Sequence, residues 1–131
     1  MRNPRTGADN FYIAPFSSRQ RPGQQLDVAA PGSWVVGPFQ LQSGKISYFF
    51  LGGTSMASPH VAGIAALMLQ KNHSLSQAQV ETILKTSATP LPAGCRSVRP
   101  GPGAPVQNIC WGDDATGAGL ATANAALAAT P

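Results

Sequence analysis

An α/β fold is predicted by three segments that follow one another directly. KISYFFL, residues 45–51, is rich in β-branched and aromatic residues and predicts a strand. GGTS, residues 52–55, predicts a tight turn, because glycine carries no Cβ, and Thr and Ser are typical of a helix start. The apolar stretch VAGIAALML, residues 61–69, then predicts a buried helix. Ser55 is expected where the turn becomes the helix.

The composition of the 131-residue chain predicts one folded domain. Hydrophobic residues make up 43% of the chain and charged residues 11%, which is enough apolar material for a core. The net charge of +4 arises partly from four arginines within the first 21 residues. They are not interleaved with aromatic side chains, so we do not expect a nucleic-acid partner.

The start of the chain, MRNPRTGADN, lacks the apolar segment of an export signal. The longest uninterrupted apolar run, IAALML, is much shorter than a membrane span. We therefore expect neither a signal peptide nor a membrane anchor in this sequence.

Two cysteines flank a segment that is dense in proline and glycine. Cys95 and Cys110 bracket RSVRPGPGAPVQNI, and we interpret residues 89–117 as a long irregular loop. A disulfide between the two would stabilise such a loop by roughly 3 kcal/mol and would indicate an oxidising compartment. Two separate buried thiols are the alternative that the sequence leaves open.

The remaining elements are predicted from local signals. Residues 1–15 are expected to be irregular, although FYIAPF at residues 11–16 forms an apolar island. LDVAAPG, residues 26–32, predicts a short buried strand, and the Gly, Pro and Ser residues after it predict a connection. The folded part is expected to cover residues 16–131.

Three helices are expected. The first runs from about Ser55 to Lys71 and has no charged face, which predicts burial on most sides. The second begins at Ser76, which forms a capping-box pattern with Gln79. A third, alanine-rich helix begins at about Thr122, after an extended piece.

Serine chemistry is possible at the predicted turn. A serine hydroxyl becomes a strong nucleophile when a base removes its proton and donors stabilise the oxyanion that forms. A helix N-terminus supplies backbone N–H donors and a positive dipole end. Taken alone, a Ser after Gly-Thr is more often a simple helix cap than a nucleophile, so the neighbouring sequence decides between the two interpretations.

The stretch GTSMASPHVAG, residues 53–63, closely resembles the nucleophile motif of the subtilisin-like serine peptidases, the subtilases. Upstream, FSSRQRPGQQLDVAAPG is similar to the segment that precedes the serine in this family. Downstream, SLSQAQVETILKTSAT resembles the next helix, and GAGLATANAA resembles the closing segment and terminal helix. The resemblance covers residues 16–128 in sequence order.

The resemblance implies the C-terminal part of a three-layer α/β fold with a largely parallel sheet. It makes Ser55 the nucleophile of an endopeptidase that forms an acyl-enzyme, with the Ser55 N–H as one oxyanion donor. Thr54 would support the oxyanion region, and Gly52 and Gly53 would leave room for the backbone of a polypeptide substrate. The family and the paired cysteines together predict a secreted protein.

No cofactor and no metal site are predicted. Subtilases often bind calcium, but this sequence offers no cluster of acidic residues for it. Asp113 and Asp114 are adjacent, and we interpret them as part of a solvated loop.

The sequence also departs from the family pattern. The catalytic Asp and His and the oxyanion Asn of subtilases precede the serine, in settings such as Asp-Thr-Gly and His-Gly-Thr-His. Neither setting occurs here, and the two histidines, His60 and His73, both follow Ser55. We therefore expect the chain alone to be inactive, and to require a complementary N-terminal part of the catalytic domain.

The sequence raises two alternatives to a subtilisin-like peptidase. The stretch from Gly53 to Ala57 loosely fits the nucleophile elbow of an α/β-hydrolase, but that fold needs an acid and then a histidine after the serine. Here both histidines precede Asp113 and Asp114, so this order excludes it. A truncated or degenerate non-enzymatic fragment, acting only by pairing with an N-terminal part, remains an alternative. Unpaired apolar edges at residues 26–32 and 45–51 also predict self-association or poor solubility of the isolated chain.

Overall fold

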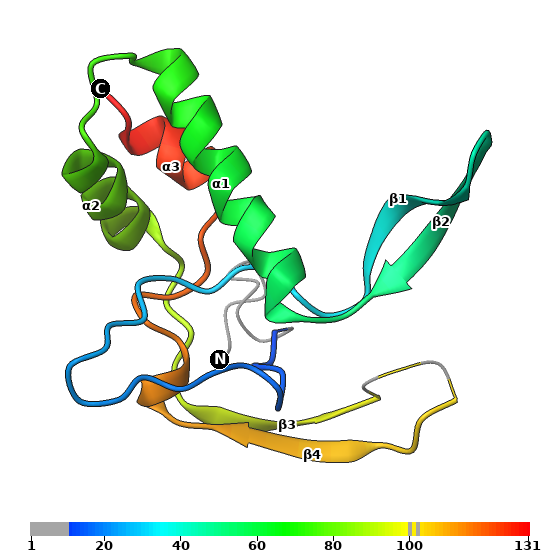
Figure 1. The fold of residues 1–131 in the computed structure, drawn as a ribbon. Helices are drawn as coiled ribbons and strands as arrows, with labels where there is room; N and C mark the ends of the chain where they lie inside the picture. The colour runs from blue at the N-terminus through cyan, green and yellow to red at the C-terminus, as the bar shows by residue number, and fades with distance from the viewer. Residues whose placement is uncertain (1–10, 100, 102) are drawn as a thin grey trace.

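The computed structural model describes residues 11–99, 101 and 103–131 (Figure 1). The elements in chain order are β1 (Val35–Gln42), β2 (Lys45–Leu51), α1 (Thr54–Lys71), α2 (Gln77–Ser87), β3 (Gly94–Val98), β4 (Gln107–Trp111), the 3-10 turn η2 (Asp113–Ala115) and α3 (Ala123–Ala129). The three helices pack at one end of the molecule, while the β1–β2 hairpin extends away from them. Of the predicted irregular segment 1–15, residues 1–10 lie outside the described residues, and residues 11–15 contain no helix or strand.

Helix α1 begins at Thr54, one residue before Ser55. Its cap is Gly53, and no side chain hydrogen-bonds to the free N–H groups of the first turn. Ser55 is therefore inside the first turn and does not cap the helix. The helix ends as expected at Lys71, whose ammonium group donates to the carbonyl oxygens of Leu127 (2.9 Å) and Thr130 (2.6 Å). These two bonds join the end of α1 to the end of α3.

The main core lies between the helices, because α3 packs against both α1 and α2. Its buried members are Ile64, Met68, Leu75, Leu84, Ala121 and Ala126. The prediction that α1 is buried on most sides was wrong. Only Ile64 and Met68 of this helix are buried, whereas Leu67 and Leu69 are 42% and 39% exposed. The reason is that the hairpins project away from α1 and do not cover it.

The predicted starts of α2 and α3 are confirmed. The backbone N–H of Ser76 donates to Gln79 Oε1 (2.8 Å), and the N–H of Gln79 donates to Ser76 Oγ (3.3 Å), which completes the capping box. At α3, the N–H of Ala125 donates to Thr122 Oγ1 (3.4 Å). Both helix starts were readable from sequence because the capping residues lie within three positions of their partners.

Two predictions about loops were wrong. The connection expected after residue 32 contains β1, which pairs antiparallel with the predicted strand β2. The segment 89–117 contains β3 and β4, which also pair antiparallel, with Cys95 directly opposite Cys110. Those two cysteines form a disulfide, so they are not separate thiols. The proline and glycine content of the whole segment predicted a loop. The stretches 94–98 and 107–111 themselves contain no proline, so their N–H groups can form a strand ladder.

The largely parallel sheet expected from the family resemblance is not formed by the described strands. The strand predicted at residues 26–32 is reduced to a parallel bridge between Ala29 and Leu120, and Leu120 also bridges Thr89 in the antiparallel direction. Ala29 donates to the carbonyl of Gly119 (2.8 Å), and Ala121 donates back to Ala29 (2.9 Å). Three extended segments thus meet beside the helices, while β1–β2 and β3–β4 are local hairpins.

The core predicts a strong effect of truncating Met68, whose exposed fraction is 0%. Replacing Met68 by Ala should lower the free energy of unfolding by about 2–5 kcal/mol, because it leaves a cavity between the helices. Leu67→Ala is the matched control on the neighbouring exposed face and should cost much less. Chemical denaturation followed by circular dichroism measures both, and equal losses in the two variants would show that the core is placed incorrectly.

Candidate active site

Ser55 lies on a junction between a strand, a turn and a helix. Strand β2 ends at Leu51, the two glycines turn the chain, and α1 begins at Thr54. Gly53 has φ 157° and ψ 158°, a conformation that favours glycine. Its N–H donates to the carbonyl of Gly32 (2.7 Å), and its own carbonyl accepts from the N–H of Met56 (3.0 Å). The Ser55 side chain is held exposed at this junction.

Two free backbone donors lie at the serine. The first N–H groups of a helix have no intrahelical acceptor, and no described residue accepts a hydrogen bond from the N–H of Thr54 or Ser55. The positive end of the helix dipole lies at the same position. Pro59 has no N–H to offer to the Ser55 carbonyl one turn earlier, so it removes one hydrogen bond from the start of the helix and adds no donor there. The junction can therefore stabilise a negative charge next to the Ser55 hydroxyl.

No general base is in place among the residues that the structure describes. None of their side chains hydrogen-bonds to the Ser55 hydroxyl. His60, on the same helix, donates from Nδ1 to the Met56 carbonyl (2.7 Å) and is exposed. His73 follows α1 at the far end of that helix. Among the described residues the site therefore combines an exposed serine with free N–H groups at a helix start, without a group that would remove the serine proton.

A cavity of about 440 Å³ lies beside the start of α1. Of the four predicted site residues, Thr54 lines it, whereas Gly52, Gly53 and Ser55 do not. Its wall consists mostly of apolar side chains, among them Phe11, Ile13, Phe16, Val28, Val61 and Leu120. The contribution of the segment around residues 11–17 was not predicted. The apolar island FYIAPF was the signal that could have indicated it.

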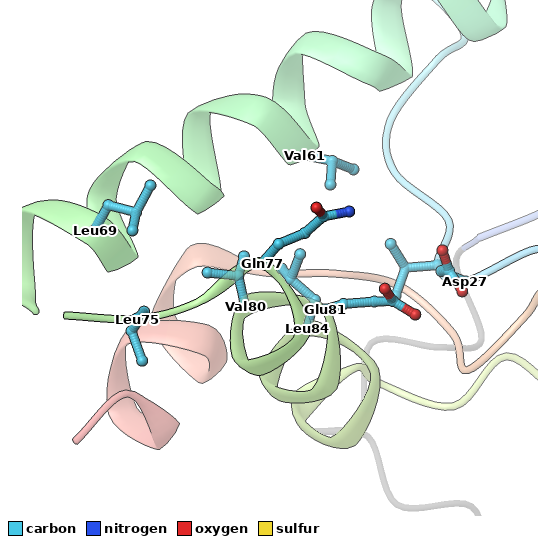
Figure 2. Close-up of a pocket in the computed structure, with 9 residues that line it drawn as sticks. Asp27, Val61, Leu69, Leu75, Gln77, Val80, Glu81 and Leu84 are labelled. Carbon is cyan, nitrogen blue, oxygen red and sulfur yellow. The ribbon is translucent and has the colours of Figure 1, made fainter. Parts of the chain in front are cut away.

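A second cavity, of about 450 Å³, lies between α1 and α2 (Figure 2). Val61 and Leu69 line it from α1, and Val80 and Leu84 line it from α2. Asp27, Val28, Leu75, Gln77 and Glu81 complete the lining. This cavity is apolar with a polar end, and Ser55 does not contribute to it.

At the polar end of this cavity, Lys85 pairs with the two acidic residues of the lining, Asp27 and Glu81. Its ammonium group lies 2.9 Å from Glu81 Oε1 and 3.2 Å from Asp27 Oδ1. The hydrogen bond to Glu81, followed by that to Asp27, raises the pKa of Lys85 above its ordinary value. Because the folded pKa is the higher one, the stabilisation is complete at neutral pH and is lost as the pH rises through that pKa. The ion pairs are partly exposed and include no residue of the Ser55 junction, so we assign them a structural role.

The described residues contain no group of three or more His, Cys, Asp or Glu side chains that could hold a metal ion. Asp113 and Asp114 are exposed in η2, and Ala115, the last residue of this turn, is buried. None of the described helices is both long and apolar enough to cross a membrane.

The chain belongs to the subtilase family, whose sequence profile matches residues 6–112. It is 47% identical over 82 residues to subtilisin DY of Bacillus licheniformis, which covers 63% of this chain and 27% of that protein. It is 44% identical over 77 residues to an extracellular protease of Xanthomonas campestris, covering 56% of this chain and 13% of that protein. The curated relatives are thus several times longer than the stretch they share with this chain.

A solved protease structure from Pseudoalteromonas arctica has a similar fold. The TM-score is 0.61 at 30% sequence identity, and the match covers 81% of this chain and 30% of the solved chain. This similarity, together with the family match, confirms the predicted subtilisin-like α/β class.

The contact between Gly32 and Gly53 predicts that a side chain at residue 32 disturbs the junction. A Cβ at Gly32 would lie 2.9 Å from the Gly53 carbonyl oxygen, so Gly32→Ala should lower the free energy of unfolding by about 1–3 kcal/mol. At Gly63, inside α1, a Cβ meets nothing within 4 Å, and Gly63→Ala should stabilise by about 0.5–1 kcal/mol. Urea denaturation compares the two, and a neutral Gly32→Ala would contradict the close approach.

Proposed function

We propose that Ser55 is the nucleophile of a subtilisin-like serine endopeptidase. The observation that carries this proposal is the position of Ser55, exposed in the first turn of α1 next to N–H groups without an acceptor. A base would take the proton from Ser55 Oγ, and the oxygen would then attack the carbonyl carbon of a polypeptide substrate. The amine leaves with a proton, and water later hydrolyses the acyl-enzyme.

The neighbouring residues support distinct parts of this reaction. The N–H of Ser55 would donate to the oxyanion, where the helix dipole also favours negative charge. Thr54 precedes the serine in the same turn and would support the oxyanion region. Gly52 and Gly53 carry no side chains, so they would let the substrate backbone approach the hydroxyl. No cofactor is needed for this chemistry.

The base is proposed to come from outside these 131 residues. Neither histidine contacts the Ser55 hydroxyl, and Nδ1 of His60 is engaged with a carbonyl of its own helix. A complementary N-terminal part of a subtilase catalytic domain would supply the Asp, the His and the oxyanion Asn. We propose that the chain alone does not cleave polypeptides, because an unactivated serine is a weak nucleophile.

Secretion is proposed on two grounds. One relative is described as an extracellular protease, and Cys95 and Cys110 form a disulfide, which persists in oxidising environments.

Labelling with a fluorophosphonate probe tests the proposal, with intact mass as the readout. The chain alone, shown to be folded by its thermal transition, should not be labelled. Mixed during refolding with the part of subtilisin DY that precedes its nucleophile motif, it should gain one label. That label should disappear in Ser55→Ala and remain in Ser58→Ala, which removes another exposed hydroxyl from the same helix.

The outcomes separate the parts of the proposal. Labelling of the chain alone that depends on Ser55 would show that a base lies within these residues. A label that survives Ser55→Ala would exclude Ser55 as the nucleophile. A mixed complex that forms without any label would favour the non-enzymatic fragment.

A further inference from the structure

The second cavity, of about 450 Å³, is lined by α1, α2 and the segment 26–32 (Figure 2). Helix α3 packs against both α1 and α2, whereas α1 and α2 do not pack closely against each other, so the space between them stays open. Its described lining contains no aromatic ring but six aliphatic side chains: Val28, Val61, Leu69, Leu75, Val80 and Leu84. Cavities of roughly 300–1,000 Å³ with mostly apolar walls are typical sites for small molecules. The cavity therefore has the size and the walls to hold a hydrocarbon chain.

The charged groups of this lining are gathered at one side. In Figure 2 the carboxylates of Asp27 and Glu81 lie close together, and Leu69 and Leu75 are on the opposite side of the cavity. Lys85 bridges the two carboxylates, since its Nζ lies 2.9 Å from Glu81 Oε1 and 3.2 Å from Asp27 Oδ1. Two carboxylates and one ammonium group leave this cluster with a net charge of −1. The cavity thus combines an aliphatic end with an anionic end.

Each of the two carboxylates has one oxygen that Lys85 does not use. The hydrogen bonds from Nζ go to Oε1 of Glu81 and Oδ1 of Asp27, and no described residue donates to Oε2 or Oδ2. A carboxylate accepts hydrogen bonds through both oxygens, and bonds from an ammonium group are about twice as strong as neutral ones. An ammonium group on a ligand satisfies these oxygens and neutralises the remaining charge, whereas an anionic head group meets an excess of negative charge.

We propose that this cavity binds a small amphiphile that has an aliphatic chain and a primary ammonium head group. The chain packs between α1 and α2, and the ammonium group donates to the free oxygens of Asp27 and Glu81. This inference is independent of the proposed peptidase function, because none of the predicted site residues 52–55 lines this cavity.

The aliphatic walls determine how the affinity should depend on the length of the chain. Burying one methylene group tightens binding by about fourfold, so the dissociation constant should fall roughly fifteenfold from butyl- to hexylammonium. The gain per methylene should end once the chain fills the cavity, because further methylenes remain in water. Adsorption to an open apolar surface or to a micelle has no such limit.

An NMR titration of the full chain with butyl-, hexyl- and octylammonium chloride, followed at the Val and Leu methyl groups, tests the proposal. The methyl signals of Val80 and Leu84 should shift to saturation, whereas those of Val36 should not. Val36 is the control for unspecific adsorption, since it is 55% exposed on β1. Octanoate has a chain of similar length and the opposite charge. It should bind about tenfold more weakly than octylammonium, because an attraction is lost and a repulsion is gained.

Two charge variants on α2 should change the affinity in opposite directions. Glu81→Gln removes one of the two carboxylates and should weaken the binding of octylammonium about threefold. Lys85→Gln removes the competing ammonium group and should tighten the binding by about the same factor. Asp114→Asn is the matched control, because it changes the overall charge as Glu81→Gln does but lies in η2, outside the lining. It should leave the affinity unchanged, and all three variants should keep the wild-type thermal transition.

The outcomes test the cavity and the head group separately. If the signals of Val80 and Leu84 do not shift to saturation with any of the three amines, the cavity is not the binding site. Shifts of equal size at Val36 would assign the binding to unspecific adsorption. Equal affinities for octanoate and octylammonium, or a change of the same sign in Glu81→Gln and Lys85→Gln, would overturn the ammonium head group.

Discussion

The candidate site depends on one backbone hydrogen bond, from the N–H of Gly53 to the carbonyl of Gly32 (2.7 Å). It joins the turn before α1 to the end of the segment 26–32, which is itself bonded to residues 118–121 through Ala29 and Asp27. At residue 32 a Cβ would lie 2.9 Å from the Gly53 carbonyl oxygen, whereas residue 53 favours glycine because its φ is 157°. The position of the serine is therefore linked to the C-terminal segment and not only to its own helix.

The helical core and the serine junction have different requirements. The core is complete within the described residues, since α1, α2 and α3 bury Met68 and Ala126 fully. The junction supplies donors for negative charge but no base, and the sides of α1 that carry Leu67 and Leu69 are partly exposed. The packing of the helices therefore does not depend on a base beside Ser55.

The two hairpins show how strand pairing can be hidden in a sequence. β2 was predicted from its β-branched and aromatic residues, but its partner β1 contains Gly37 and Pro38, which masked it. The strands around Cys95 and Cys110 were masked in the same way by the prolines and glycines between them. In each case the turn residues were recognised. The pairing of the strands on either side of them was not, because it depends on the register between two segments.

The sequence by itself determined the starts of α2 and α3, the strand–turn–helix order at Ser55, and the family. These features rest on residues a few positions apart, and a capping box or a glycine turn needs no distant partner. The tertiary structure alone decided which face of α1 is buried, where the segment 11–17 lies, and that Gly32 contacts Gly53. Those outcomes depend on contacts between segments about 20 to 90 residues apart, which local propensity does not encode.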